Sequence, residues 1–288
     1  MQQFLTDQQA LSFLVQQASY VETEVDEVDY PEIQYPDLIP VDFSAGEWTK
    51  TITRFVSDKV GQAQWFNHLA RDVPRADVSM NKLETIVEMA AIGYGYTMEE
   101  LAQAQMLSRQ ISGYRLDTAR ANAARFAYEK FVDNFLMFGD VPKGIAGLTN
   151  YPTLAASMVA ATGTGGSTLW ANKTPDQQLS DVNAGLVGIY TGTNEVEWAD
   201  TVLLPYSRLL NLGDVARGSS TDTTILQFLL KANAFTAVTG RPLTVRGVRG
   251  LDTAGAGGSA RMVVYRRDER VLKAHIPMRH KFLDPMRT

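Results

Sequence analysis

The sequence has no cysteine among its 288 residues, which excludes disulfide bonds, thiolate metal sites and cysteine nucleophiles. It has only three histidines, so a zinc site has few ligands to draw on. No apolar run approaches the roughly 20 residues of a membrane-spanning helix, and the amino terminus lacks the basic region of a signal peptide. We therefore expect a soluble, unexported protein that is compatible with a reducing cytoplasm.

Familiar catalytic motifs are also missing. The sequence has no Gly-x-Ser-x-Gly elbow, no His-Glu-x-x-His and no calcium loop. Gly139 and Gly144 have the spacing of a phosphate-binding loop, but Ile145 and Ala146 stand where the required Lys and Ser or Thr would follow. Residues 255–260 fit a dinucleotide-binding pattern without the strand and helix that should flank it. We predict no catalytic residue, no metal and no cofactor; an enzyme with a diffuse site is the alternative from a different class.

Charge is distributed unevenly along the chain. Residues 1–49 contain ten acidic residues and no Lys or Arg, whereas residues 261–288 contain eight basic and three acidic residues. An acidic arm and a basic tail thus flank a neutral body. Such asymmetry is typical either of an interaction surface or of solvated tails, and the charges alone leave both readings open.

A long β-hairpin is predicted in the first third of the chain. Residues 48–57 and 78–90 are rich in β-branched residues and alternate with a period of two. Both faces mix polar and apolar groups, and a two-stranded ribbon is marginally stable alone, so we expect it to lean on its own chain or on a neighbour. Trp65 and Phe66 lie near the tip, either as a local cluster or as an anchor in a neighbouring subunit. The preceding residues 20–40 contain three prolines and predict an extended arm.

Two helices and a glycine-rich turn follow. Thr97 and Glu100 form a capping box that opens the first helix, and a longer helix is predicted over 116–138, ended by Gly139. One apolar stripe of the longer helix comprises Leu116, Ala119, Ala123, Ala127, Phe131, Phe135 and Phe138.

These parts, in this order, resemble the major capsid proteins of tailed phages, which have the Hong Kong-type capsid fold that encapsulin compartments share. A Gly-Ile-x-Gly-Leu-x-Asn-x-Pro pattern carries most of the resemblance. It comprises Gly144, Ile145, Gly147, Leu148, Asn150 and Pro152. The resemblance implies that this loop turns the chain from the spine helix into a peripheral domain, so its glycines, including Gly139, serve backbone geometry rather than phosphate binding.

The second half is similar to the axial domain of the family, a small sheet flanked by helices. The expected helices cover 176–190, a turn from 206 after the strand 201–205, and a segment capped by Asp222 that ends at Gly240. Further strands are expected at 243–248, 260–267 and 271–276, the last two joined across Asp268 and Glu269 as a basic strand pair. The final strand that usually returns to the peripheral domain is not identified before the sequence stops.

The resemblance implies an α+β fold in four parts. These are an amino-terminal arm (1–47), an extended β-hairpin loop (48–92), a peripheral domain with the spine helix (93–175 plus 277–288) and an axial domain (176–276). The implied function is a structural protein that self-assembles as hexamers and pentamers into the icosahedral shell around a tailed-phage genome. The implied location is the virion capsid, assembled in the host bacterial cytoplasm, and an encapsulin-like compartment is the alternative.

The resemblance also implies partners and contact residues. Portal, scaffold or decoration proteins of the same phage are expected partners, with DNA enclosed without sequence-specific binding and no membrane. The family lays its arm across an adjacent subunit, so arm acids are expected to meet the basic strand pair, for which a solvated strand and DNA contact are the alternatives. The candidate residues are Glu22, Glu24, Asp26, Glu27 and Asp29 in the arm, Arg266, Arg267 and Arg270 in the strand pair, and Trp65 and Phe66 at the hairpin tip.

Overall fold

The computed structural model describes residues 28–65, 74–107, 115–151, 157–218 and 222–283. The chain divides into two compact units, Met1–Glu32 with Ala90–Lys130, and Ile33–Met89 with Phe131–Thr288. Helix α4 (Leu116–Phe138) contributes to both. Across the part of the chain that the structure describes, no helix is both long and apolar enough to cross a membrane.

The first unit joins helix α3 (Met98–Leu107) to the amino-terminal part of α4. The predicted capping box is present: the Thr97 N–H donates to the Glu100 carboxylate at 2.9 Å, and the Glu100 N–H donates to the Thr97 hydroxyl at 3.1 Å. The Arg120 guanidinium donates to both carboxylate oxygens of Glu100, at 3.1 and 3.2 Å. These bonds lower the pKa of Glu100 to about 2, so the pair stays ionised at neutral pH.

Helix α4 has the predicted bounds, and Gly139 ends it with φ of +70°. The predicted apolar stripe, however, marks the packed side of the helix only in part: Phe135 and Phe138 are half-buried, and Phe138 packs against an apolar cluster. Phe131 is 52% exposed, whereas the buried residues are Ala124, Val132 and Met137. Two of the buried residues, Ala124 and Val132, thus come one position after a residue of the predicted stripe. The segments that pack against the helix decide which side is buried.

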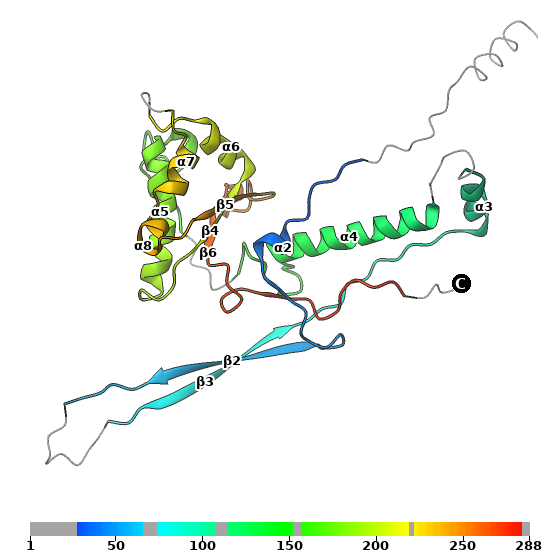
Figure 1. Ribbon diagram of the computed structural model, residues 1–288, viewed down its shortest axis with the longest axis horizontal. Helices are drawn as coiled ribbons and strands as arrows, with labels where there is room; N and C mark the ends of the chain where they lie inside the picture. The colour runs from blue at the N-terminus through cyan, green and yellow to red at the C-terminus, as the bar shows by residue number, and fades with distance from the viewer. Residues whose placement is uncertain (1–27, 66–73, 108–114, 152–156, 219–221, 284–288) are drawn as a thin grey trace, which may run out of the picture. The chain divides into compact units, whose positions relative to one another are not determined.

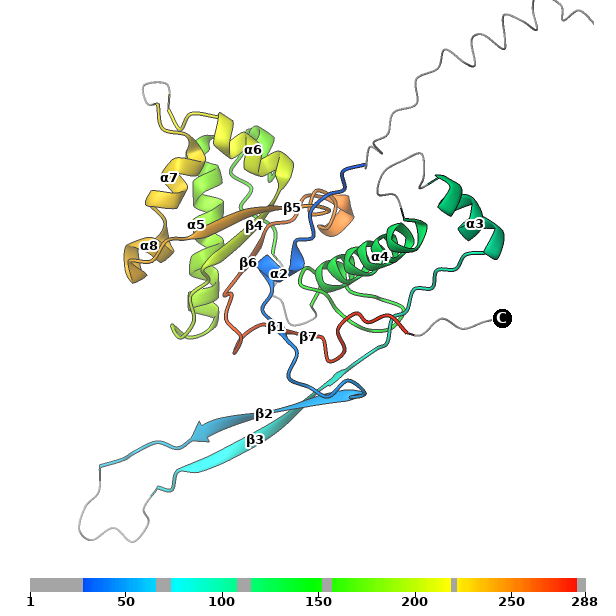
Figure 2. The same ribbon diagram turned by 45° about the vertical axis from the view of Figure 1, so that its right-hand side comes forward.

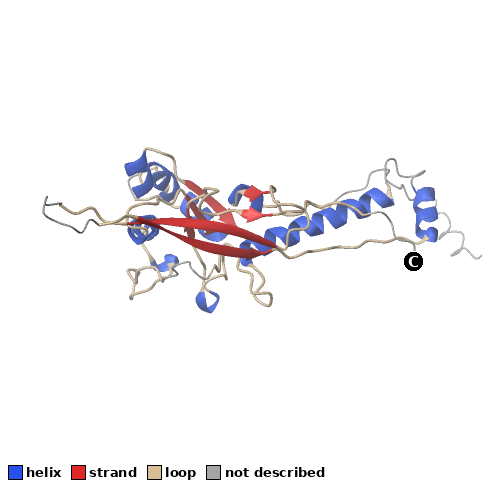
Figure 3. Cartoon of the chain, turned by 90° about the horizontal axis from the view of Figure 1, so that it is seen from below, coloured by secondary structure: helices blue, strands red, loops and turns tan. Residues whose placement is uncertain are grey.

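The predicted hairpin is formed by β2 (Thr51–Val60) and β3 (Asp77–Ile86), which pair antiparallel from Thr51↔Ile86 to Val60↔Asp77 (Figure 1). Ile52 is half-buried and every other residue of the two strands is exposed. The ribbon is thus an extension of the second unit rather than part of its core, as the two long strands in Figure 3 show.

The core of the second unit is a three-stranded sheet in the order β5 (Thr244–Val248), β4 (Thr201–Pro205), β6 (Val263–Tyr265). Strand β4 is parallel to β5, antiparallel to β6 and buried at every residue. Its continuous apolar run is typical of a strand covered on both faces. Helices α5 (Pro175–Gly192), α6 (Tyr206–Asp214), α7 (Ile225–Lys231) and α8 (Ala234–Thr239) gather around this sheet (Figure 2).

Alternate residues of β4 face two different apolar clusters. Val202 and Leu204 pack with α5, α7 and α8, while Leu203 packs with residues from α2 (Tyr35–Leu38), the end of α4 and the turn after it. Beside the second cluster, β1 (Val41–Asp42) pairs in parallel with β7 (Ala274–His275). The arm segment is therefore anchored to the chain near its carboxyl end.

Two predictions from the second half are wrong. The strands predicted at 260–267 and 271–276 do not pair with each other, because β6 joins β4 and β7 joins β1. The helix predicted from an Asp222 cap to Gly240 is two helices: Thr224 caps α7, and Asn233 ends that run and caps α8 by accepting from the Thr236 N–H at 2.8 Å. Asn233 favours a cap over a helix interior, which explains the break. The Gly240 stop, with φ of +68°, is confirmed.

Candidate assembly surfaces and the spine-helix turn

The glycine-rich turn after α4 folds back on the end of the helix. The Asn150 side chain accepts from the Gly147 N–H at 2.7 Å and donates to the Phe138 carbonyl at 2.8 Å. The Leu148 N–H donates to the Leu136 carbonyl at 2.8 Å, so the returning chain occupies carbonyls that the helix end leaves free. Gly144 has φ of +69°. The turn is a backbone-bonded reversal within the second unit. Pro152 lies outside the described residues.

We expect Gly147→Ala to destabilise the subunit by about 3 kcal/mol, as overpacking against backbone does. A Cβ at Gly147 would lie 2.6 Å from the Phe138 nitrogen and 2.7 Å from the Met137 carbonyl carbon, and these backbone atoms cannot rotate away. Gly144→Ala is the matched control, because a Cβ there meets no atom within 4 Å and only the positive φ is unfavourable, by about 1 to 2 kcal/mol. Urea unfolding followed by circular dichroism measures both, and equal losses would contradict close approach as the role of Gly147.

The hairpin is held to its own unit at its root. The Arg54 guanidinium donates to the Arg270 carbonyl at 2.5 Å, and Lys143 of the glycine-rich turn pairs with Glu88 at 3.3 Å. Lys281 pairs with Glu47 at 2.8 Å just before β2. Exposed pairs of this kind contribute about 0 to 1 kcal/mol each, so the ribbon is weakly held by its own subunit.

The predicted tip residue Trp65 is fully exposed. Its side chain therefore packs against no other described residue, and its role as an anchor in a neighbouring subunit stays a prediction. Phe66 lies outside the described residues.

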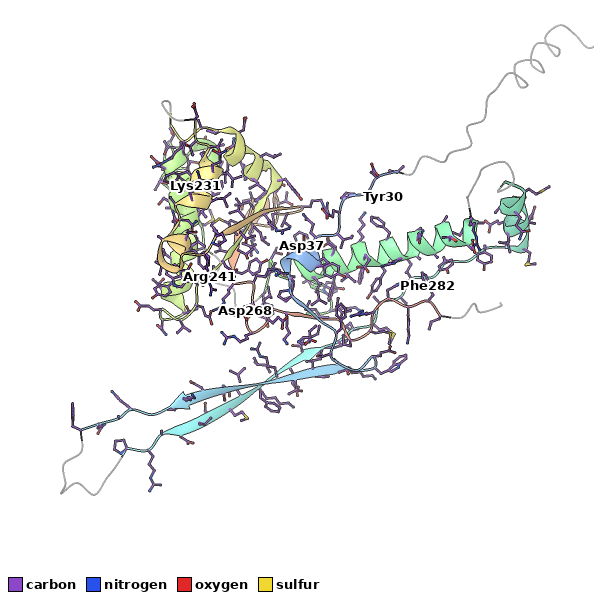
Figure 4. All side chains as sticks on the ribbon, viewed as in Figure 1. Tyr30, Asp37, Lys231, Arg241, Asp268 and Phe282 are labelled. Carbon is purple, nitrogen blue, oxygen red and sulfur yellow. The ribbon has the colours of Figure 1, made fainter. Side chains whose placement is uncertain are left out.

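The predicted basic residues are largely engaged within the chain. Arg266 forms ion pairs with Glu197 and with Asp268, the latter at 3.0 Å. The Arg267 N–H donates to Asp200 at 2.8 Å. The loop around Asp268 is marked in Figure 4. The side chain of Arg270 is 74% exposed, and its guanidinium lies 3.7 Å from the Asp268 carboxylate.

The acidic arm and the basic tail meet inside one chain. Asp42 of β1 pairs with Lys273 at 3.2 Å, next to the Glu47–Lys281 pair. Hydrogen bonds from Ser44 and Lys273 hold the pKa of Asp42 well below its usual range. Part of the predicted charge complementarity is therefore intramolecular. Of the arm candidates, Asp29 is exposed; Glu22, Glu24, Asp26 and Glu27 lie outside the described residues.

An enzyme-like site would require converging ionisable side chains or a group of metal ligands. Among the residues with a described position, no group of three or more His, Asp or Glu side chains could hold a metal ion. One open hollow of about 550 Å³ contains a single basic and a single acidic side chain. It is lined by Tyr35, Pro36, Pro40, Val41, Phe43, Arg267 and Glu269. This lining offers apolar and ring surfaces rather than a converging set of acid and base groups.

The fold described above is similar to that of a solved capsid structure. The solved structure "The capsid of Myoviridae Phage XM1" is similar over 91% of this chain and 84% of that chain, with a TM-score of 0.71 and 17% identity. At this identity the likeness shows the fold, and it confirms the predicted α+β class of a capsid protein.

The sequence family described as "Major capsid protein" matches residues 61–288. The chain therefore belongs to the major capsid protein family and is a structural capsid protein. The resemblance to tailed-phage major capsid proteins, inferred from the sequence, is confirmed. A comparison with curated proteins found no match.

Proposed function

We propose that this chain builds the icosahedral shell around the genome of a tailed bacteriophage, as hexamers and pentamers with the Hong Kong-type arrangement. The parts would be the arm (1–47), the hairpin loop (48–92), the peripheral domain (93–175 plus 277–288) and the axial domain (176–276). Identical subunits that pack around a symmetry axis form closed rings, and the symmetry fixes the number of subunits in each ring.

A single observation carries the proposal: a long ribbon with exposed apolar side chains extends from a well-packed body. Phe55, Met80 and Leu83 are 64, 66 and 56% exposed on this ribbon, although a two-stranded ribbon has little stability of its own. Large exposed apolar patches mark contact sites, and family membership makes further copies of the chain the partner. The ribbon would tie neighbouring subunits together.

Other partners and the location belong to the same proposal. Self-association and a capsid location follow from the family. Assembly in the host cytoplasm, together with portal, scaffold or decoration proteins, is proposed on the resemblance to tailed-phage capsid proteins. The shell would enclose DNA without sequence-specific contacts and would need no cofactor.

The arm is proposed as a second contact between subunits. In this proposal Glu22, Glu24, Asp26, Glu27 and Asp29 contact a neighbouring subunit, whereas Asp42 and Glu47 pair within the chain. Because Arg266 bridges Glu197 and Asp268, Arg270 is the better candidate partner on the basic side. A charge-reversal substitution of Arg266 would break ion pairs within its own subunit. It could therefore not test a contact between subunits by itself.

We expect the purified chain, alone or with a scaffold protein from the same phage, to form closed shells above a threshold concentration. Negative-stain microscopy would show rings and shells, and sedimentation would show a cooperative transition. If the shell is a phage capsid, shells isolated from infected cells should contain genomic DNA. Shells that contain protein cargo and no genome would indicate the encapsulin-like alternative. Absence of any ordered assembly under both conditions would contradict the proposal.

A further inference from the structure

A short segment near the amino-terminal end of the second unit contacts both helix α4 and the three-stranded sheet. It comprises residues 34–38, which include α2, and we call it the linking segment. Helix α2 is drawn in blue beside α4 in Figure 1, and Asp37 marks it in Figure 4. Leu38 of this segment shares an apolar cluster with Met137 of α4 and Leu203 of β4. The linking segment is therefore part of the core that joins the end of α4 to the sheet.

Polar contacts of the linking segment add direction to this apolar packing. The burial of apolar surface is non-directional, whereas a hydrogen bond weakens steeply when its donor and acceptor are misaligned. Hydrogen bonds that run from one segment to both the helix and the sheet can therefore specify the angle between the helix and the sheet.

On the side of α4, one carboxylate holds the backbone of the linking segment. Asp133 of α4 accepts from the Gln34 N–H at 3.0 Å and from the Tyr35 N–H at 2.7 Å, both at Oδ1. Its other oxygen lies 3.8 Å from the guanidinium of Arg249, which follows β5. The Asp133 side chain is only 16% exposed, so water competes little for these bonds.

On the side of the sheet, the Gln34 side chain makes the contacts. Its amide nitrogen donates to the Tyr206 hydroxyl of α6 at 2.7 Å and to the Gly247 carbonyl of β5 at 3.2 Å. Its amide oxygen accepts from the Arg249 N–H at 3.4 Å. Both donors of the amide and its oxygen are thus engaged. Gln34 is bonded to α4 through its backbone and to the sheet through its side chain.

Two glycines bring aromatic rings directly against the backbone at the same junction. A Cβ at Gly247 would lie 2.7 Å from two ring carbons of Tyr206. A Cβ at Gly250, in the turn after β5, would lie 2.5 Å from the ring of Phe138, the last residue of α4. Even one added methyl group would overpack both contacts. The helix end therefore has little room to rotate against the sheet.

We propose that Gln34 and Asp133 are positioning residues, which set the angle between the end of α4 and the sheet and thereby the curvature of the assembled shell. The inference rests on the proposed function, in which α4 belongs to the peripheral domain and the sheet to the axial domain. The rotation between neighbouring subunits decides whether a ring closes, so an altered angle within each subunit is repeated at every contact.

Two single substitutions with a matched control test the inference. Gln34→Ala removes the bonds to the sheet, and Asp133→Ala removes the bonds to α4. Asp37→Ala is the control in the same segment, because it breaks only an exposed pair with Arg246, whose side chains are 65 and 49% exposed. In negative-stain images we expect the fraction of particles that are closed shells of wild-type diameter to fall about fivefold in each test variant, with open or differently sized particles in their place. The control should change this fraction by less than about twofold.

A conservative variant separates positioning from stability. Asp133→Asn keeps an oxygen that can accept from the two backbone N–H groups, so its shells should keep the wild-type diameter even if its unfolding midpoint falls. Circular dichroism and urea unfolding check the fold of each subunit. If an alanine variant does not fold, Tyr206→Phe decides instead, because it removes one hydroxyl that accepts from Gln34, and it should lower the fraction about twofold.

Three results would overturn the inference. These are shells of wild-type diameter in the folded test variants, an equal effect of the control, and folded variants that give only free subunits, since the last would show a role in affinity rather than in curvature. An unchanged fraction in Tyr206→Phe would count in the same way where that variant decides. Failure of the wild-type chain to assemble would instead count against the proposed function itself.

Discussion

Replacing Trp65 and Phe66 together with serine is expected to give a folded, soluble subunit that no longer forms stable shells. Trp65 is fully exposed, so its removal takes no packing from its own subunit. Aromatic anchors in the centre of an interface often account for about 2 kcal/mol or more each, and the same loss would recur at every copy in a shell. Circular dichroism should show an unchanged spectrum, and sedimentation should show loss of the assembled species.

The control for this experiment lies in the same loop. Gln62→Ser with Gln64→Ser changes two exposed polar neighbours and should leave assembly within about threefold of the wild type, since surface changes away from packed features have small effects. Shells of unchanged stability in the aromatic variant, or loss of folding in it, would remove the anchoring role of the tip.

The largest effect on folding is expected at the buried ion pair between Lys173 and Asp181. Their side chains are 0 and 3% exposed, and the ammonium lies 2.6 Å from the carboxylate. Lys173 also donates to the Ala160 carbonyl at 2.7 Å, and the Trp170 indole N–H donates to Asp181 at 2.8 Å. Lys173→Ala leaves a buried carboxylate without its cation, which costs about 3 to 5 kcal/mol.

Urea unfolding of the purified subunit measures this loss. Lys281→Ala is the matched control, because it breaks an ion pair whose side chains are 46 and 54% exposed, worth about 0 to 1 kcal/mol. Lys173→Met with Asp181→Leu should recover part of the stability, since no buried charge then lacks a partner. If Lys173→Ala lowers the free energy of unfolding no more than the control does, the ion pair does not stabilise the segment before α5.

The turn after α4 was the best-predicted candidate site. Its glycine and asparagine pattern predicted a backbone reversal, and the structure has the Asn150 bonds and the positive φ of Gly139 and Gly144 there. The contact residues were harder to place. No local pattern in the sequence predicts the ion pair of Arg266 with Glu197, which lies 69 positions earlier. The exposure of Trp65 likewise depends on what surrounds the tip.

By itself the sequence determined the features that short-range rules govern. The bounds of α4 follow from helical periodicity and a glycine stop, β4 from its uninterrupted apolar run, and the hairpin from alternation with a period of two. The order of these parts and the turn pattern were enough to indicate the family. Each signal is local because capping, periodicity and positive φ involve residues within a few positions of one another.

Only the tertiary structure decided which surfaces meet. Strand β6 pairs with β4 and β7 with β1, although a hairpin between β6 and β7 was the shorter connection. The side of α4 that packs and the attachment of the hairpin root to its own unit were decided in the same way. All of them depend on contacts between residues far apart in the chain, where the free energy of burying shared apolar surface outweighs local preference.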